Sequence, residues 1–326
     1  MHFQPTEDQE ALRAGVRDLL AGRYGREALR ASVDGAAGGG PPGAGPGGAG
    51  PAGGPVVDRG LWRELGGAGF FALRLPEAEG GVGLGLPEAV LAFEEAGRVL
   101  LPGPLVATHL AAGVVPGAAA GKAVVTAFDL GGDLVAYLGE ADAVLGAAGE
   151  PVPAGEPVRS ADPLTPLHRV AGYGGGGAYG GGGVSEYRAT GALLTAALQV
   201  GSALRTLELA VRYAAQREQF GQPIGGFQAV KHLCAGMLVR AEVARTALYA
   251  AAVTADPGEI AAAKLLADRA AVEGARDCLQ VYGGMGFTWE ADVHLHLKRA
   301  WVRAEQWRTA AQAEELLAEE LLASGP

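Results

Sequence analysis

Residues 217–228 read Arg-Glu-Gln-Phe-Gly-Gln-Pro-Ile-Gly-Gly-Phe-Gln, and residues 280–287 read Gln-Val-Tyr-Gly-Gly-Met-Gly-Phe. A long helical pattern precedes each stretch. The first helix is expected to end near Phe220, because Gly221 suits a left-handed cap and Pro223 prevents the helix from continuing. The next helix carries apolar residues at strict three-four spacing: Phe227, Val230, Cys234, Met237, Ala241, Ala244 and Leu248. This spacing is typical of the seam of an antiparallel bundle, and residues 186–326 are predicted to form a four-helix bundle.

The composition limits the class of protein and its partners. The chain has 326 residues, a formal net charge of −10 and 49% hydrophobic residues. An acidic globular chain argues against nucleic acid as a partner, because phosphate binding needs clustered Lys and Arg. No apolar run reaches the roughly 20 residues that span a bilayer, and the N-terminus lacks the layout of a signal peptide. We therefore expect a cytoplasmic protein that does not bind membranes.

Metal and disulfide chemistry are not expected. The two cysteines, Cys234 and Cys278, both lie within helical patterns. His294 and His296 are two residues apart, which on a helix points them to different faces. The sequence predicts no metal site.

The remainder of the chain divides into two regions by its texture. Residues 1–120 are expected to form a helical domain, with helices over 5–32, 61–65, 87–99 and 103–114. Residues 34–56 are almost all Gly, Pro and Ala, and we interpret them as a disordered insertion. Residues 121–185 contain short β-like runs at 124–128, 134–138 and 143–145, followed by a glycine tract at 172–183. A short β region is expected there.

The side chains of the first stretch suit a ligand with a pyrophosphate and an attached ring system. Arg217 is placed at the end of a helix, where its charge complements the helix dipole and it can bind an anion through two donors. Gln219 and Gln228 supply hydrogen bonds, and Phe220 and Ile224 supply apolar area. In the second stretch, glycines allow the backbone to approach a ligand closely. For either stretch alone, an ordinary helix–turn–helix corner followed by a glycine cap is the favoured interpretation.

The two stretches in this order resemble the acyl-CoA dehydrogenase family of flavoproteins. The N-terminal segments 61–65, 73–77 and 80–83 are also similar to the first domain of that family. The resemblance implies a mainly α fold with an N-terminal helical domain, a middle β region that is short here, and a C-terminal bundle. It also implies that residues of both stretches contact the ADP half of FAD across a subunit interface: Arg217, Gln219, Phe220, Ile224, Gln228, Gln280, Gly283 and Gly284.

A family member oxidises an acyl-CoA between Cα and Cβ. A carboxylate removes the α-proton, the flavin takes the hydride, and an electron-transfer acceptor protein reoxidises it. The resemblance gives two usual positions for the carboxylate, which fall here near Gly191 and near Trp307 or Arg308. Glu305 is the nearest acid to the second position, and a solvated helix acid is its more ordinary interpretation. The catalytic base is therefore unknown, with Glu305 a weak candidate.

The short β region also bears on the cofactor. Residues 121–185 contain no Trp and few Ser or Thr, whereas full-length members carry Trp-containing and Thr/Ser-rich loops there that hold the flavin ring. We expect that this chain does not hold the ring by itself.

Three hypotheses follow from these departures. In the first, the chain is a subunit without a base that pairs with a full-length relative in an α2β2 heterotetramer, similar to actinobacterial enzymes for bulky thioesters such as steroid side chains. In the second, it is a self-sufficient flavoenzyme, or homo-oligomer, with Glu305 or another acid recruited. In the third, it is a scaffold that kept the fold and lost the chemistry.

Overall fold

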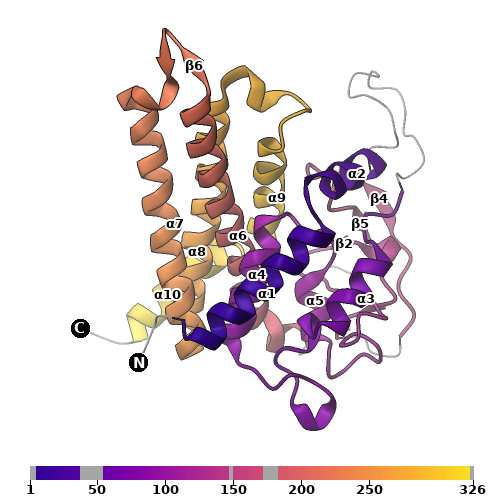
Figure 1. The fold of residues 1–326 in the computed structure, drawn as a ribbon. Helices are drawn as coiled ribbons and strands as arrows, with labels where there is room; N and C mark the ends of the chain where they lie inside the picture. Colours follow the sequence, from indigo (N-terminus) through magenta and orange to yellow (C-terminus); the bar gives the residue numbers. More distant parts are fainter. Residues whose placement is uncertain (1–4, 37–53, 147–149, 172–182, 324–326) are drawn as a thin grey trace.

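The computed structural model describes residues 5–36, 54–146, 150–171 and 183–323. The C-terminal helices stand side by side in one half of the molecule, and the N-terminal helices and short strands occupy the other half (Figure 1). The glycine tract at 172–182 and the Gly/Pro-rich residues 37–53 lie outside the described residues.

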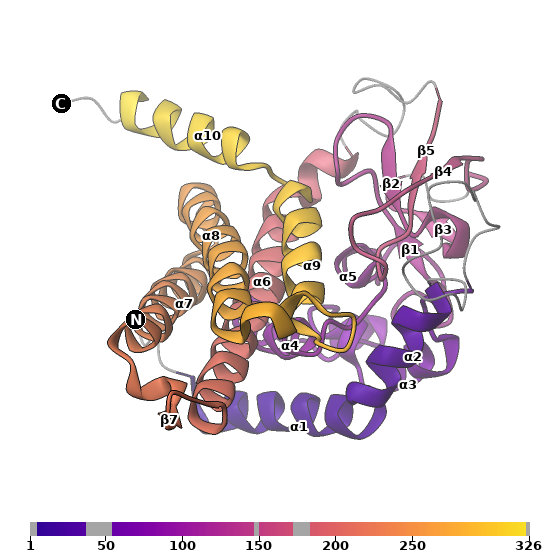
Figure 2. The same ribbon diagram turned by 90° about the horizontal axis from the view of Figure 1, so that it is seen from above.

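The C-terminal half is a helical bundle, as expected. It contains α6 (Gly183–Gln216), α7 (Gln228–Thr254), α8 (Pro257–Tyr282), α9 (Val293–Glu305) and α10 (Ala310–Ala323). The seam predicted on α7 is confirmed, since Met237, Ala241, Ala244 and Leu248 are all buried. α8 begins with Pro257 at its first position and Asp256 as its cap, whose side chain accepts from the Glu259 amide at 2.9 Å. Seen from above, α10 extends away from the other helices beyond α8 (Figure 2).

The N-terminal half contains α1 (Glu7–Arg23), α2 (Arg26–Ala36), α3 (Arg59–Gly67), α4 (Leu86–Arg98) and α5 (Leu105–Leu110). The single helix expected over 5–32 is two helices, because the chain breaks at Tyr24–Gly25. Both ends of the insertion expected at 34–56 are structured. Residues 34–36 complete α2, and Val56 and Val57 are buried with their amides donating to the Glu140 carboxylate.

Buried charges attach α1 to α4. Glu94 and Glu95 of α4 are 0% and 2% exposed. Arg13 of α1 donates to both carboxylates at 2.7 and 2.9 Å, and Arg17 donates to Glu95. Tyr249 of α7 donates to Glu94 at 2.8 Å. Buried carboxylates need such partners, so this network fixes α1 across the junction between the two halves.

The β region is small, and the sequence patterns found only part of it. β1 (Val125–Thr126) pairs with β3 (Ala143–Val144) in parallel. β5 (Leu167–Arg169) lies between β2 (Leu134–Ala136) and β4 (Glu156–Val158), antiparallel to both. The β-like runs at 124–128, 134–138 and 143–145 contain β1, β2 and β3, whereas β4 and β5 were not predicted.

A hairpin connects α6 to α7. The first of these helices ends earlier than expected. α6 ends at Gln216 rather than near Phe220, and β6 (Glu218–Gln219) then pairs with β7 (Gln222–Pro223). Phe220 and Gly221 both have positive φ, 54° and 79°, so the left-handed residues form the hairpin turn and not a helix cap. Among the described helices, none is long and apolar enough to cross a membrane.

Candidate functional site

The residues predicted to bind a cofactor gather at one end of the bundle. Because α6, α7 and α8 run up, down and up, the segment 217–228 and the segment 280–287 lie at the same end (Figure 1). Ile224 is half-buried, and the other predicted residues are exposed: Arg217, Gln219, Phe220, Gln228, Gln280, Gly283 and Gly284. We call this end the grip. It presents a guanidinium, three amides and an aromatic ring outward.

Backbone geometry explains the residue types at the grip. The Arg217 carbonyl accepts from the Ile224 amide at 2.7 Å, which closes the hairpin. A Cβ on Gly225 would lie 3.0 Å from the Ala214 carbonyl, so glycine lets the returning chain pack on α6. Gly283 has φ 59° and ψ −142°, a conformation that favours glycine, and it turns the chain sharply out of α8. Both turns therefore depend on the glycines of the motif.

The two positions where a catalytic carboxylate was sought lie in contact, because the Trp307 side chain packs on Gly191. Trp307 is 2% exposed, and a Cβ on Gly191 would lie 2.2 Å from its Cδ2. The indole therefore packs directly on the glycine backbone of α6. Trp307 also has a positive φ of 63°. We call this contact, together with Gln306 and Asp129 described next, the tryptophan corner.

Asp129 holds the tryptophan corner from the β region. Its carbonyl accepts from the Trp307 amide at 2.6 Å, and its Oδ2 accepts from Gln306 Nε2 at 2.9 Å. Burial raises the pKa of the Asp129 carboxyl to about 7, although its own backbone amide and Gln306 lower it. Sequence patterns did not indicate this acid, because Asp129 follows a short strand and its partner is far along the chain.

The space next to the tryptophan corner is small and positively charged. The cavity bounded by Trp307, Gln306 and Asp129 has a volume of about 30 Å³. Arg299 and Arg303 of α9 line it and are each 3% exposed. Arg299 is paired with Asp162, while Arg303 donates to the Leu198 carbonyl at 3.2 Å. Burial and the neighbouring Arg299 lower the pKa of Arg303 to about 9.

Glu305, the weak candidate for a base, lies away from this space. It is the last residue of α9, is exposed, and lines neither this cavity nor the larger one described next.

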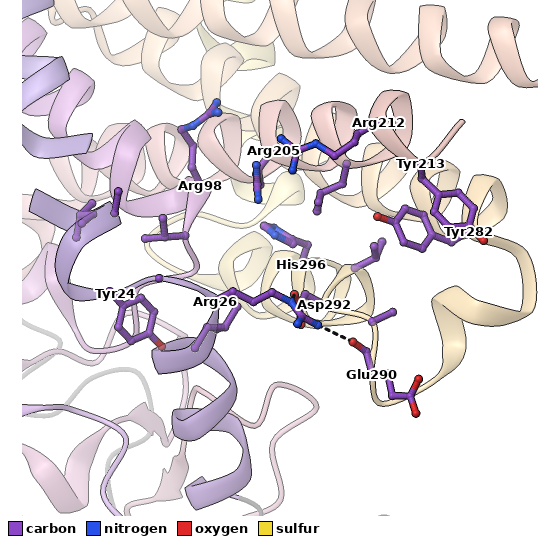
Figure 3. Close-up of a pocket in the computed structure, with 18 of the residues that line it drawn as sticks. Tyr24, Arg26, Arg98, Arg205, Arg212, Tyr213, Tyr282, Glu290, Asp292 and His296 are labelled. Carbon is purple, nitrogen blue, oxygen red and sulfur yellow. Dashed lines mark hydrogen bonds and ion pairs between the residues drawn. The ribbon is translucent and has the colours of Figure 1, made fainter. Parts of the chain in front are cut away.

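A cavity of greater volume lies elsewhere, between the N-terminal helices and the bundle. Its volume is about 780 Å³, and α1, α2, α4, α6 and α9 contribute to its walls. Figure 3 shows Arg98, Arg205 and Arg212 along one side, with Tyr213 and Tyr282 at one end. No sequence pattern indicated it, because its residues come from separate segments that only the fold brings together. His296 lines this cavity, whereas His294 stacks on Trp289, so the two histidines lie in different environments.

Known families match most of this chain. The profile of the acyl-CoA dehydrogenase C-terminal domain matches residues 188–311, and that of the N-terminal domain matches residues 52–123. The acyl-CoA dehydrogenase IpdE2 of Mycobacterium tuberculosis is 33% identical over 310 residues, which cover 91% of this chain and 92% of that protein. The acyl-CoA dehydrogenase FadE34 of the same organism is 35% identical over 278 residues, covering 74% of this chain and 39% of FadE34.

Solved structures agree with these matches. A chain of the ChsE4-ChsE5 complex from Mycobacterium tuberculosis superposes with a TM-score of 0.81 at 25% identity, covering all of both chains. A chain of the Tcur3481-Tcur3483 steroid acyl-CoA dehydrogenase superposes with a TM-score of 0.77 at 22% identity, covering 98% of each, which shows the shared fold. The chain thus belongs to the acyl-CoA dehydrogenase family, the FAD-dependent oxidoreductases that act on CH–CH groups.

Proposed function

We propose that this chain is the subunit without a catalytic base in a heteromeric acyl-CoA dehydrogenase. It contributes its grip to an FAD whose ring and base lie in a full-length partner. The pair desaturates a CoA thioester between Cα and Cβ.

The observation that carries the proposal is Trp307 packed on Gly191. Both usual places for a carboxylate are occupied by residues without one, and the indole of Trp307 packs directly on Gly191. General-base catalysis requires the base within hydrogen-bonding reach of the proton it removes. Glu305 is exposed at the end of α9 and lines neither of the two cavities described above, which argues against it as the base.

The fit to FAD differs between the two halves of the cofactor. Arg217 is suited to the pyrophosphate, and the amides of Gln219, Gln228 and Gln280 to the ribose and phosphate oxygens. The exposed backbone of Gly283 and Gly284 permits close approach of a ligand. The 30 Å³ cavity at the tryptophan corner is about a tenth of the smallest usual ligand pocket, which holds roughly 300 Å³, so it does not fit a three-ring flavin. FAD, when bound, supplies the hydride acceptor, and this chain binds and orients its ADP half.

The exposed surface of the grip supports a partner chain. Phe220 is 92% exposed and Phe287 75% exposed at the same end of the bundle, and α7 exposes Leu238, Val239 and Val243. Exposed apolar side chains that gather on one surface are a feature of sites that other proteins cover. The name of the ChsE4-ChsE5 relative describes a complex of two proteins, which is consistent with a heteromer here.

The test is the visible absorption spectrum of the chain purified alone and after co-expression with a full-length homologue from the same source. We expect a colourless chain alone and a yellow complex with flavin absorbance. Arg217→Ala should then lower the FAD content of the complex. Arg63→Gln, which replaces an exposed arginine on α3, is the control. Stoichiometric FAD on the chain alone would overturn the proposal. An unchanged complex and unchanged activity with Arg217→Ala would indicate a scaffold instead.

A second candidate, a self-sufficient flavoenzyme, is favoured by one observation. Asp129 lies at the tryptophan corner, and its pKa of about 7 suits a general base. In that case Asp129→Asn would abolish turnover by the chain alone while flavin absorbance persisted, and Glu305→Gln would not. In the heteromer we expect Asp129→Asn to leave activity within a factor of a few, because Asp129 only positions Gln306 and Trp307.

A further inference from the structure

The 780 Å³ cavity is a separate feature from the grip and the tryptophan corner. It lacks Trp307, Gly191 and all the residues predicted to contact FAD, although Tyr282 and Met285 lie in the same segment as Gly283. Its volume falls within the roughly 300–1,000 Å³ of small-molecule sites. A ligand of this chain's own therefore has room to bind there.

One wall of the cavity carries an excess of positive charge. Arg205 and Arg212 are seven residues apart on α6, which is two helical turns, and so share a face. Arg98 of α4 lies beside them (Figure 3). Glu208 pairs with both Arg98 and Arg205, and Arg212 has no ion pair among the described residues. Arg98 also pairs with the buried Glu95 at 3.5 Å. Three guanidiniums on this wall thus share two carboxylates, and Arg212 pairs with neither of them.

A histidine in the inner part of the cavity lies close to the same arginines. His296 is 3% exposed, and its Nδ1 shares a hydrogen bond with Ser202 Oγ at 2.7 Å. Burial, together with the charges of the nearby arginines, lowers the pKa of His296 to about 3; these arginines are Arg205, Arg303, Arg299 and Arg98. The imidazole is neutral at physiological pH, so it offers polarity without adding to the cationic charge.

Much of the rest of the lining is apolar or carries paired charges. On the side of α1, α2 and α9, Arg26 is paired with Asp292 at 2.6 Å and donates to the Glu290 carbonyl. Tyr213 and Tyr282 stack at 4.1 Å with an angle of 14° and close one end. Aliphatic side chains cover much of the remaining wall: Leu20, Leu29, Val99, Leu209 and Val293.

We propose that this cavity binds an anionic amphiphile, with its carboxylate or phosphate on Arg98, Arg205 and Arg212 and its apolar body against the aliphatic wall. A purely polar anion would leave that wall wet, and an uncharged lipid would leave Arg212 without a counter-ion. A flexible acyl chain and a rigid polycyclic acid share the required chemistry. The proposal is independent of the proposed function, because it involves neither FAD nor a partner subunit.

Isothermal titration calorimetry on the full chain tests this proposal with four probes. Dodecanoate supplies a flexible body and cholate a rigid one. Octyl glucoside below its micelle concentration carries no charge, and ADP carries charge without an apolar body. We expect one dodecanoate or cholate per chain, and the tighter of the two identifies the shape of the body. Equal binding of octyl glucoside or of ADP would overturn the proposal.

Two variants locate the binding. Arg212→Gln removes an exposed, unpaired guanidinium, and we expect about tenfold weaker binding, as for the loss of one charge-assisted hydrogen bond. Leu209→Trp fills the cavity and should abolish binding, with circular dichroism to confirm folding. Arg63→Gln, an exposed arginine on α3, is the matched control and should bind as the wild type does. Unchanged binding in Arg212→Gln would place the ligand elsewhere and refute the site.

Discussion

Gly191 is the residue on which the tryptophan corner depends. A methyl group there would lie 2.2 Å from the indole, and both the ring and the α6 backbone are buried, so neither moves freely. We predict that Gly191→Ala lowers the free energy of unfolding by about 1–3 kcal/mol, the usual cost of overpacking a core. Urea denaturation measures this loss.

A second variant separates the clash from the general effect of alanine in a helix. In a Trp307→Ala background the added methyl meets open space, and Gly191→Ala should then stabilise by about 0.5–1 kcal/mol. Gly15→Ala, in the exposed middle of α1 with nothing within 4 Å, should show the same small gain in the wild type. If Gly191→Ala destabilised the wild type and the Trp307→Ala variant equally, a clash with the indole would not explain the loss.

Asp129 is expected to make the free energy of unfolding decrease as the pH rises. Its pKa is raised to about 7 in the folded chain, against about 3.9 when unfolded. Between these values the unfolded state loses the proton and the folded state keeps it, so the contribution of Asp129 to stability falls as pH rises from 4 to 7. Above pH 7 it is constant. We predict that the change is at most about 4 kcal/mol.

Asp129→Asn isolates that contribution. Asn still accepts from Gln306 but does not titrate in this range. Buried histidines act with the opposite sign, since the pKa values of His109 and His296 are lowered to about 4 and about 3 by burial, so the wild-type curve alone is a mixture. The difference between wild type and variant, from urea unfolding at pH 4 to 8, should decline towards pH 7. A flat difference would contradict the raised pKa.

At the scale of elements, a buried ion pair fixes the end of α9 that carries the tryptophan corner. Lys264 of α8 is 1% exposed, pairs with Asp268 and donates to the Arg303 carbonyl at 3.1 Å. Gln199 of α6 donates to Asp268 and to the Ala300 carbonyl, both at 3.0 Å. Burial lowers the pKa of Lys264 and raises that of Asp268, and the attraction between the two groups opposes both shifts.

Removing one member of that pair should be costly. Lys264→Met leaves the Asp268 carboxylate buried without a cation, and we predict a loss of about 3–5 kcal/mol in the free energy of unfolding. The double variant Lys264→Met with Asp268→Leu should recover much of it. Lys231→Met, an exposed lysine on α7, is the control and should stay within about 0.5 kcal/mol. A loss in the double variant as large as in the single one would argue against an uncompensated charge.

Elements with a local period were predictable from the sequence, and those set by distant pairing were not. The α7 seam follows from three-four spacing, which depends only on residues one turn apart. β4 and β5 contain Glu-Pro-Val and Leu-His-Arg, which do not alternate, and their strand character comes from pairing across the sheet. The end of α6 was placed four residues late because a hairpin, rather than a cap, uses the left-handed residues Phe220 and Gly221.

The candidate site divides in the same way. The segments of the grip are continuous motifs, and their placement at one end of the bundle follows from helix order alone. The tryptophan corner joins residues 129, 191 and 307, and the large cavity joins residues of α1, α2, α4, α6, α8 and α9, so neither has a local signature. Glu94 and Glu95 illustrate the same limit. Two adjacent glutamates on a helix suggest a solvent-exposed face, and only the fold places Arg13 and Arg17 against them.

For the molecule as a whole, the exposed ring of Phe220 offers a test of assembly. Phe220 sits at the tip of the hairpin, 92% exposed, and within the chain its ring meets Phe227 edge-on at 6.1 Å. Its φ of 54° is a conformation that Asp adopts more readily than Phe. Phe220→Asp should therefore leave the melting temperature of the chain alone nearly unchanged.

In a heteromer the same substitution should be severe, because a charge would enter the apolar surface that meets the partner and the cofactor. We predict that Phe220→Asp fails to co-purify with a full-length homologue, or does so without flavin absorbance. Leu322→Asp, on α10 and 83% exposed, should co-purify and retain flavin. Size-exclusion chromatography with light scattering gives the assembly and the visible spectrum gives the flavin. A yellow complex of normal mass with Phe220→Asp would mean that the hairpin does not face the partner, and the FAD-binding role of Arg217 beside it would lose its basis.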